Sequence, residues 1–188
     1  DFAVAHVDHG QRDESAADAA FIARYCARYG LAFESRRLKL PRQSSEALLR
    51  KARYAALFEI ARARECKVLL TAHHAGDQLE TFLLRLLRGS HPDTIRGIPA
   101  QSVREGIAIV RPFLVFEKKE LAAFASECGI CWREDETNRS PKFARNRIRY
   151  ELLPLLESIR AGASRNAFAF FDELEKNSGT ERRSDENE

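Results

Sequence analysis

A compact set of arginines is the part of this sequence best suited to chemistry. The range 139–149 contains five basic side chains and no acidic one. Within it Arg145, Asn146, Arg147 and Arg149 lie close together, and a leucine-rich segment follows. Guanidinium groups bind phosphate oxygens through paired hydrogen bonds, so such a set, joined to a helix that can dock on a core, is typical of phosphate recognition. A solvated basic helix end is the alternative that composition alone allows.

Three further polar clusters combine imidazole, carboxylate and guanidinium groups. Groups of these kinds suit a nucleotide phosphate and its Mg²⁺ if the fold brings them together. Histidines at strand ends also pack there without binding a ligand, and a zinc site is poorly supported because no two histidines share a helical face. The residues of these clusters are His6, His9, His73, His74, Asp77 and Arg111.

The elements that must position these residues follow from an alternation of apolar runs and amphipathic segments. Strands are predicted at 2–7, 33–40, 67–72 and 107–114, and helices at 13–29, 46–65, 77–88 and 117–128. This order predicts an α/β fold with a doubly wound, mostly parallel, Rossmann-like sheet, followed by a helical segment. Because ligands bind outside the carboxyl ends of parallel strands, we expect the polar clusters to converge there.

Helix ends are marked by particular residues in this reading. Ser45 is expected to cap the helix at 46–65, and Gly30, Gly89 and Gly129 are expected to end three helices. We therefore expect the boundaries of these helices to lie within a residue or two of those positions.

Four cysteines are scattered through the chain, and Cys128 with Cys131 forms a Cys-x-x-Cys pair. Cys128 falls at the end of a helical pattern, which favours structural thiols over a redox site, and a zinc site needs about four ligands. The sequence has no run of 18 apolar residues. We therefore expect a cytoplasmic protein without a membrane partner.

Length and charge suggest one domain with an appendage. The chain has 188 residues, a net charge of +3 and 44% hydrophobic residues. It contains no methionine and opens directly on a strand, which predicts an N-terminal truncation. We expect an incomplete α/β domain at 1–135, a basic helical segment at 136–175 and a disordered polar tail at 176–188. The mildly basic body permits a polyanionic partner.

Several segments together resemble one enzyme family. The segment 71–90, which begins Thr-Ala-His-His-Ala-Gly-Asp-Gln, looks like the strand-turn-helix of tRNA(Ile)-lysidine synthetases, members of the PP-loop ATP pyrophosphatase superfamily. The tryptophan-to-arginine segment is the most specific part of the resemblance. The other similar segments are 6–10, 51–54, 111–114, and 132–138 with 145–149.

The resemblance implies an ATP-dependent ligase that modifies tRNA. The family adenylates the C2 oxygen of the wobble cytidine in an isoleucine tRNA with a CAU anticodon, and the ε-amine of L-lysine then displaces AMP. ATP and Mg²⁺ are the implied cofactors. By resemblance the catalytic residues are His73, Asp77 and Arg111, with Asp77 also a metal ligand. The implied nucleotide contacts are His6, His9 and His74, and the implied tRNA contacts are Arg53, Arg145, Asn146, Arg147 and Arg149.

The basic segment also admits a structural role. Arg145, Arg147 and Arg149 could instead pair with acidic residues and fix the helical segment to the core. The candidate partners are Glu134, Asp135 and Glu151.

Three departures from the family pattern keep other functions open. The family's Ser-Gly-Gly-x-Asp-Ser phosphate loop occurs nowhere in this sequence, Gly76-Asp77 replaces two adjacent aspartates, and His91-Pro92 begins the segment where the family has a glycine-rich turn. One alternative is another PP-loop tRNA-modifying enzyme that thiolates a base with Cys128 and Cys131. The other is a non-catalytic RNA-binding remnant.

The absent loop generates a prediction about the isolated chain. Without the backbone N–H groups of that loop, ATP·Mg²⁺ should bind weakly or not at all, since each lost hydrogen bond to a charged partner costs about 1.5–3 kcal/mol. Titration calorimetry measures this directly, and micromolar affinity would contradict the prediction.

Overall fold

The computed structural model describes residues 2–8, 10, 15–41, 44–91, 97–133 and 144–184, and the strands in this part form two sheets. The chain divides into two units, residues 1–69 with 103–108 and residues 70–102 with 109–188.

The first unit contains a parallel strand pair. β1 (Ala3–Asp8) pairs in parallel with β2 (Ala32–Arg37), and His6 lies opposite Ser35. Helix α1 (Ser15–Arg28) connects the two strands and buries Cys26. This is the strand-helix-strand unit that the alternating pattern predicts.

Helix α2 (Glu46–Ala63) follows β2 and begins where the sequence predicts. The hydroxyl of the N-cap residue Ser45 accepts a hydrogen bond from the Leu48 N–H at 3.3 Å. The helix buries Tyr54, Phe58 and Ile60, and the Tyr54 and Phe58 rings lie 5.9 Å apart.

The second sheet has the strand order β3-β5-β4, formed by Val68–Leu70, Ile107–Val110 and Gln101–Arg104. The Ala108 N–H donates to the Lys67 carbonyl and the Thr71 N–H to the Val110 carbonyl, so partners advance together as in a parallel pair. β4 and β5 form a tight hairpin through Glu105 and Gly106, both with positive φ.

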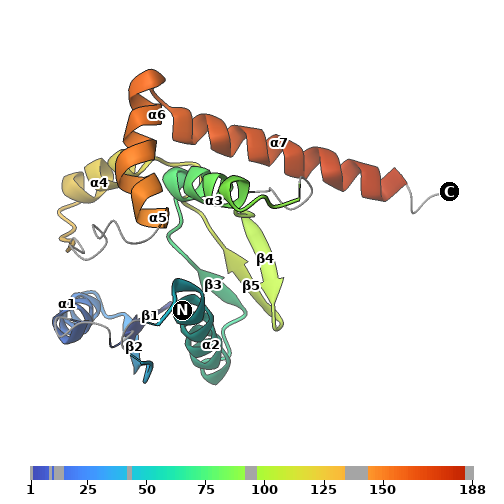
Figure 1. Cartoon of the computed structure of the whole chain (residues 1–188). Coiled ribbons are helices and arrows are strands. Elements are labelled where there is room, and N and C mark those ends of the chain that lie inside the picture. The colour runs from blue at the N-terminus through green and yellow to red at the C-terminus, as the bar shows by residue number, and fades with distance from the viewer. Residues whose placement is uncertain are drawn as a thin grey trace. The chain divides into compact units, whose positions relative to one another are not determined.

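Helices dominate the second unit. α7 runs alongside α3, and the Phe82 and Phe171 rings lie 5.3 Å apart at this contact (Figure 1). The π-helical turn η3 ends two residues before Pro154, which has no backbone N–H to continue the regular ladder. The helices are α3 (Ala75–Leu87), α4 (Lys118–Glu127), α5 (Ala144–Arg147), η3 (Ile148–Leu152), α6 (Leu153–Ile159) and α7 (Ala163–Ser184).

The predicted α/β fold with parallel strand pairing is confirmed, and so are the predicted helix ends. Gly30, Gly89 and Gly129 have φ of 65°, 64° and 64° and each follows a helix. The predicted strand at 107–114 is shorter, because residues 112–115 form a turn. β4 was not predicted, since its sequence Gln-Ser-Val-Arg lacks an apolar alternation.

Helix α7 covers Ala163–Ser184, so the backbone of residues 176–184 is helical. The predicted division into a helical segment at 136–175 and a disordered tail at 176–188 stays a prediction, and residues 185–188 lie outside the described part. The predicted boundary at 135–136 lies outside the described residues. No helix in the described part is both long and apolar enough to cross a membrane.

Candidate functional site

The site centres on the N-terminus of α3, where the chain leaves β3. His74 is the N-cap residue, with an extended backbone, and its Nδ1 accepts a hydrogen bond from the Gly76 N–H at 3.1 Å. The Asp77 Oδ2 accepts in return from the His74 N–H at 3.0 Å. This reciprocal pair is a capping box in which an imidazole replaces the usual hydroxyl.

Gly76 and the His74 ring are sterically coupled. A Cβ at position 76 would lie 2.9 Å from the His74 Cε1 and 3.1 Å from its Nδ1. Any side chain at this position would therefore displace the imidazole from its cap. Glycine at position 76 therefore fits beside the His74 ring that caps the helix.

The His74 imidazole is held in its neutral form. Burial lowers the pKa of His74, and Arg149 and Lys118 lower it further, while Asp77 opposes them. Because Nδ1 accepts the Gly76 N–H, the remaining proton belongs on Nε2, which lies 3.5 Å from the Asp77 Oδ2.

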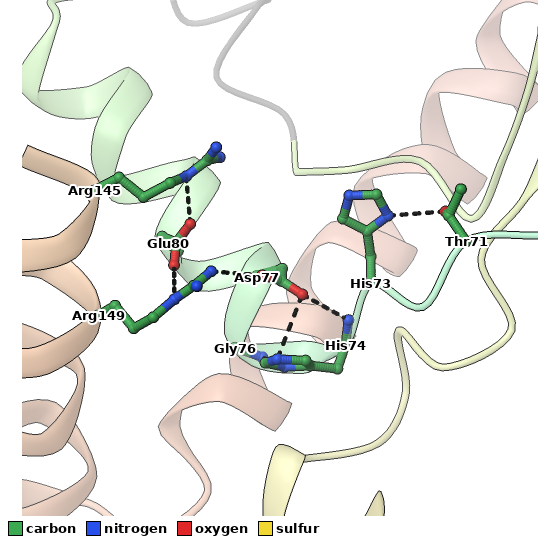
Figure 2. A network of polar contacts seen from close by, with 8 residues as sticks. All are labelled: Thr71, His73, His74, Gly76, Asp77, Glu80, Arg145 and Arg149. Carbon is green, nitrogen blue, oxygen red and sulfur yellow. Dashed lines mark hydrogen bonds and ion pairs between the residues drawn. The ribbon is translucent and has the colours of Figure 1, made fainter. Parts of the chain in front are cut away.

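A buried carboxylate one turn along α3 joins this cap to the basic segment. Glu80 is only 1% exposed, and Figure 2 shows Arg145 and Arg149 converging on it. The Arg149 Nε donates to the Glu80 Oε2 at 2.7 Å, and Arg145 forms an ion pair with Oε1. Burial raises the pKa of Glu80, and the two guanidinium groups oppose that rise.

Arg149 also reaches Asp77, with 3.1 Å between its Nη2 and the carboxylate Oδ1. Both oxygens of Asp77 therefore receive donors from the chain itself. The described residues contain no group of three or more His, Cys, Asp or Glu side chains placed to hold a metal ion. In this arrangement the residues present do not fit a Mg²⁺ site, and the predicted role of Asp77 as a metal ligand has no support from its contacts.

The three arginines of the basic segment do not act as one surface. Arg145 and Arg149 turn toward α3, whereas Arg147 is 64% exposed and pairs with Glu151 one helical turn along, at 3.0 Å. Asn146 is half-buried between them. Of the acidic partners that the sequence suggested, Glu151 is used, while Glu134 and Asp135 lie outside the described residues.

Arg111 donates hydrogen bonds to a neighbouring segment of the chain. Its Nη1 donates to the Pro99 carbonyl at 2.7 Å and to the Ser102 Oγ at 3.3 Å. Arg85 donates to the Gly97 carbonyl at 3.3 Å. The Arg111 side chain is therefore bound to the segment that leads into β4, and within the described residues it forms no hydrogen bond with His73 or Asp77.

Gln78 also binds the backbone of the segment 97–99. Its amide donates to the Ile98 carbonyl at 3.0 Å and accepts the Ile98 N–H, as a neighbouring strand would. A Cβ on Gly97 would come within 2.4 Å of the Gln78 Oε1, so glycine is required where the amide packs. Three consecutive carbonyls are thus held by three different side chains.

The remaining predicted residues are placed separately. The His73 Nδ1 lies 2.9 Å from the Thr71 Oγ1. The His6 Nε2 is buried on β1, with no hydrogen-bond partner among the described residues. The Arg53 guanidinium lies 5.8 Å from the Tyr54 ring centre. His9 lies outside the described residues. Of the predicted residues that the structure describes, His6 and Arg53 belong to the first unit and the others belong to the second.

Glu80 and Gln78 are the site residues that sequence reasoning did not assign. Both lie on the buried face of α3 beside Leu79. A charged side chain within an apolar stripe is almost never fully buried unless it is paired. That signal was available in the sequence for Glu80, but it could not identify the partners.

A double-mutant cycle tests whether the inward arginines fix the helical segment. We expect Glu80→Gln and Arg149→Gln to be coupled by about 1–3 kcal/mol in the free energy of unfolding, because they remove one buried contact. The exposed pair Arg147→Gln and Glu151→Gln is the matched control and should show much weaker coupling. Denaturant melts measure both cycles, and equal coupling would contradict the structural role.

Comparison with known proteins identifies the family of this chain. The PP-loop domain model matches residues 1–156. The tRNA(Ile)-lysidine synthase of Thermus thermophilus is 42% identical over 176 residues, which cover 90% of this chain and 33% of that protein. The enzyme of the same name from Solibacter usitatus is 44% identical over 154 residues, which cover 81% and 34%. The chain therefore spans about a third of the length of these curated relatives.

A solved structure shares the fold. The U34-tRNA thiolase NcsA from Methanococcus maripaludis, determined with its 4Fe-4S cluster, superimposes with a TM-score of 0.71 at 13% identity. The match covers 90% of this chain and 60% of that one. Fold, motifs and sequence similarity agree, the resemblance seen in the sequence is confirmed, and the chain belongs to the PP-loop domain family.

Proposed function

We propose that this chain is the PP-loop region of a tRNA(Ile)-lysidine synthase, which joins L-lysine to C2 of the wobble cytidine of an isoleucine tRNA. The observation that carries the proposal is the contact of Glu80 with Arg145 and Arg149. It joins the two segments that most resemble lysidine synthetases, 71–90 and 145–149, into one site. The similarity to lysidine synthases of several bacteria supports the same reading.

The proposed reaction has two steps. The C2 oxygen of the cytidine attacks the α-phosphorus of ATP, and pyrophosphate leaves. The ε-amine of lysine then attacks C2, the C2–O bond breaks, AMP leaves with its oxygen, and the amine loses a proton. Both steps need charge stabilisation on phosphoryl oxygens. Mg²⁺ would arrive with ATP and take most of its ligands from phosphate and water.

The roles proposed for individual residues follow from the motifs and the contacts together. His73 and Asp77 remain the candidates for contact with the reacting groups, and His6, His9 and His74 for contact with the nucleotide. We assign Arg111 to positioning the segment 97–102, because its donors point at that backbone.

The proposed tRNA contacts separate into two groups. Arg53, Asn146 and the exposed Arg147 are candidates for direct contact, while Arg145 and Arg149 are proposed to hold the helical segment against α3. The tRNA would carry a CAU anticodon, and the expected compartment is the cytoplasm.

Base thiolation is the second candidate reaction, and one observation bears on it. Cys128 and Cys131 are both free and exposed, so they are accessible to chemistry. However, Cys128 is the C-cap residue of α4, whereas a helix N-terminus is the position that activates a thiolate. This geometry favours the ligase over the thiolase.

Lysine incorporation tests the proposal. The protein should be assayed as its whole reading frame encodes it, with ATP, Mg²⁺, labelled lysine and a tRNA(Ile) transcript with a CAU anticodon. We expect ATP-dependent label in the tRNA and a lysidine peak in nucleoside mass spectrometry. Cys128→Ser with Cys131→Ser should leave the rate unchanged. Sulfur incorporation that these changes abolish would show the thiolase instead.

Asp77→Asn separates the charge of Asp77 from its capping role. The amide oxygen of asparagine can still accept the His74 N–H, so the helix cap should largely persist. We expect the rate of lysidine formation to fall on the order of 100-fold, a loss typical of a single electrostatic contact in a site. The matched control Asp77→Ala should also lower the melting temperature. Full activity in Asp77→Asn would remove Asp77 from the catalytic group.

A further inference from the structure

Three arginines surround one tyrosine ring in the first unit. The guanidinium carbons of Arg50, Arg53 and Arg104 lie 5.1, 5.8 and 6.0 Å from the centre of the Tyr54 ring. Arg50 and Arg53 come from the first half of α2, and Arg104 comes from the end of β4. Tyr54 itself is only 5% exposed, so the three guanidinium groups lie around a buried ring. We call these four residues the Tyr54 cluster.

Two cations of the Tyr54 cluster, Arg50 and Arg104, carry charge that no described residue neutralises. Within the described residues, neither Arg50 nor Arg104 forms an ion pair or a hydrogen bond with a carboxylate. Glu105, the acidic neighbour of Arg104 in the sequence, is paired with Arg62 instead. Lys51, on the same helical turn as Arg50, adds a further exposed cation.

Other arginines on this unit show what an ordinary surface looks like. Each of three exposed or half-buried arginines pairs with a glutamate elsewhere in the unit. The pairs are Arg36 with Glu59, Arg62 with Glu105, and Arg64 with Glu34. Arg50 and Arg104 differ because they lie over the Tyr54 ring and pair with no carboxylate among the described residues.

Such a convergence is stabilised only in part by the ring. A cation over an aromatic face gains about 0.5–1 kcal/mol at an exposed site, and every added cation also repels the others. A partner that brings negative charge therefore gains from all the cations at once. Guanidinium groups match phosphate oxygens in geometry and stack on flat rings.

We propose that the Tyr54 cluster binds the phosphate backbone of tRNA, with Arg50 and Arg104 as direct contacts beside Arg53. This rests on the proposed function, which makes tRNA the substrate. Charge complementarity selects a polyanion, and the closeness of the cations to one ring limits the contact to a few neighbouring phosphates. Because β4 was not predicted, Arg104 could not be placed beside α2 from the sequence.

The salt dependence of tRNA binding tests the surface. The whole protein and its Arg50→Gln/Arg104→Gln variant are titrated with a tRNA(Ile) transcript by filter binding from low to physiological salt. Losing two phosphate contacts should reduce the slope of log affinity against log salt by roughly 1.4–1.8. Binding of an unrelated tRNA transcript should weaken equally, because phosphate contacts do not read sequence.

Two controls separate phosphate binding from folding. Arg28 lies 5.8 Å from the Tyr29 ring centre as a single cation, so Arg28→Gln removes a similar contact without the cluster and should leave the slope unchanged. The variant Arg50→Lys/Arg104→Lys keeps both charges and should keep most of the slope. Melting curves of all variants show whether Tyr54 packing has been lost.

The outcomes distinguish this surface from the reaction. An unchanged slope in a folded glutamine variant overturns the surface, whether or not lysine is incorporated, and so does absence of tRNA binding by the unchanged protein. A reduced slope supports the surface. The third outcome is that the unchanged protein binds tRNA, the glutamine variant has the reduced slope, and no lysidine forms. In that case the proposed function fails while the RNA-binding surface stands.

Discussion

The burial of the Glu80 carboxylate is the constraint on which the second unit depends. A carboxylate that is 1% exposed is tolerable only with charged partners, and both partners come from a segment more than sixty residues later in the chain. Removing one partner of such a group typically costs about 3–5 kcal/mol. The position of α5 and η3 against α3 is therefore set by charge as well as by the packing of the buried Ile148.

Helical geometry decides which arginines serve this constraint. Residues four apart share one face of a helix, while residues two apart lie on nearly opposite faces. Arg145 and Arg149 can therefore both reach α3, and Arg147 must point away from it to solvent. In the sequence the three look like one alternating set. Because the three arginines lie on a helix rather than a strand, two of them contact α3 and the third is exposed to solvent.

The sequence was informative wherever a local rule applied. Ser45 as a cap and Gly129 as a helix end need only short-range chemistry, and so does the alternation that predicts β1, α1 and β2. β4 was missed although its partner strand is close to it in the chain. It has no apolar pattern of its own, and the tight turn at Glu105-Gly106 pairs it with β5.

The contacts of the predicted site residues depend on the fold. Arg111 was predicted from its motif to be catalytic, and its guanidinium donates to the carbonyl of Pro99, a contact that no local pattern predicts. Asp77 was predicted to bind a metal, and its two oxygens accept from Arg149 and the His74 N–H. The roles of both residues stay predictions.

Pairing, more than the local density of basic residues, decides where this chain can offer charge to a polyanion. In the described part of the most basic stretch, all three arginines are paired, since Arg145 and Arg149 contact Glu80 and Arg147 contacts Glu151. The arginines at Tyr54 are separated in the sequence and inconspicuous there, yet they converge without carboxylate partners for Arg50 or Arg104 among the described residues. A charge that already has a partner must lose it before it can bind a phosphate, whereas an unpaired one gives up only water. Arg50 and Arg104 are therefore better placed to bind a polyanion than the paired arginines of the basic segment.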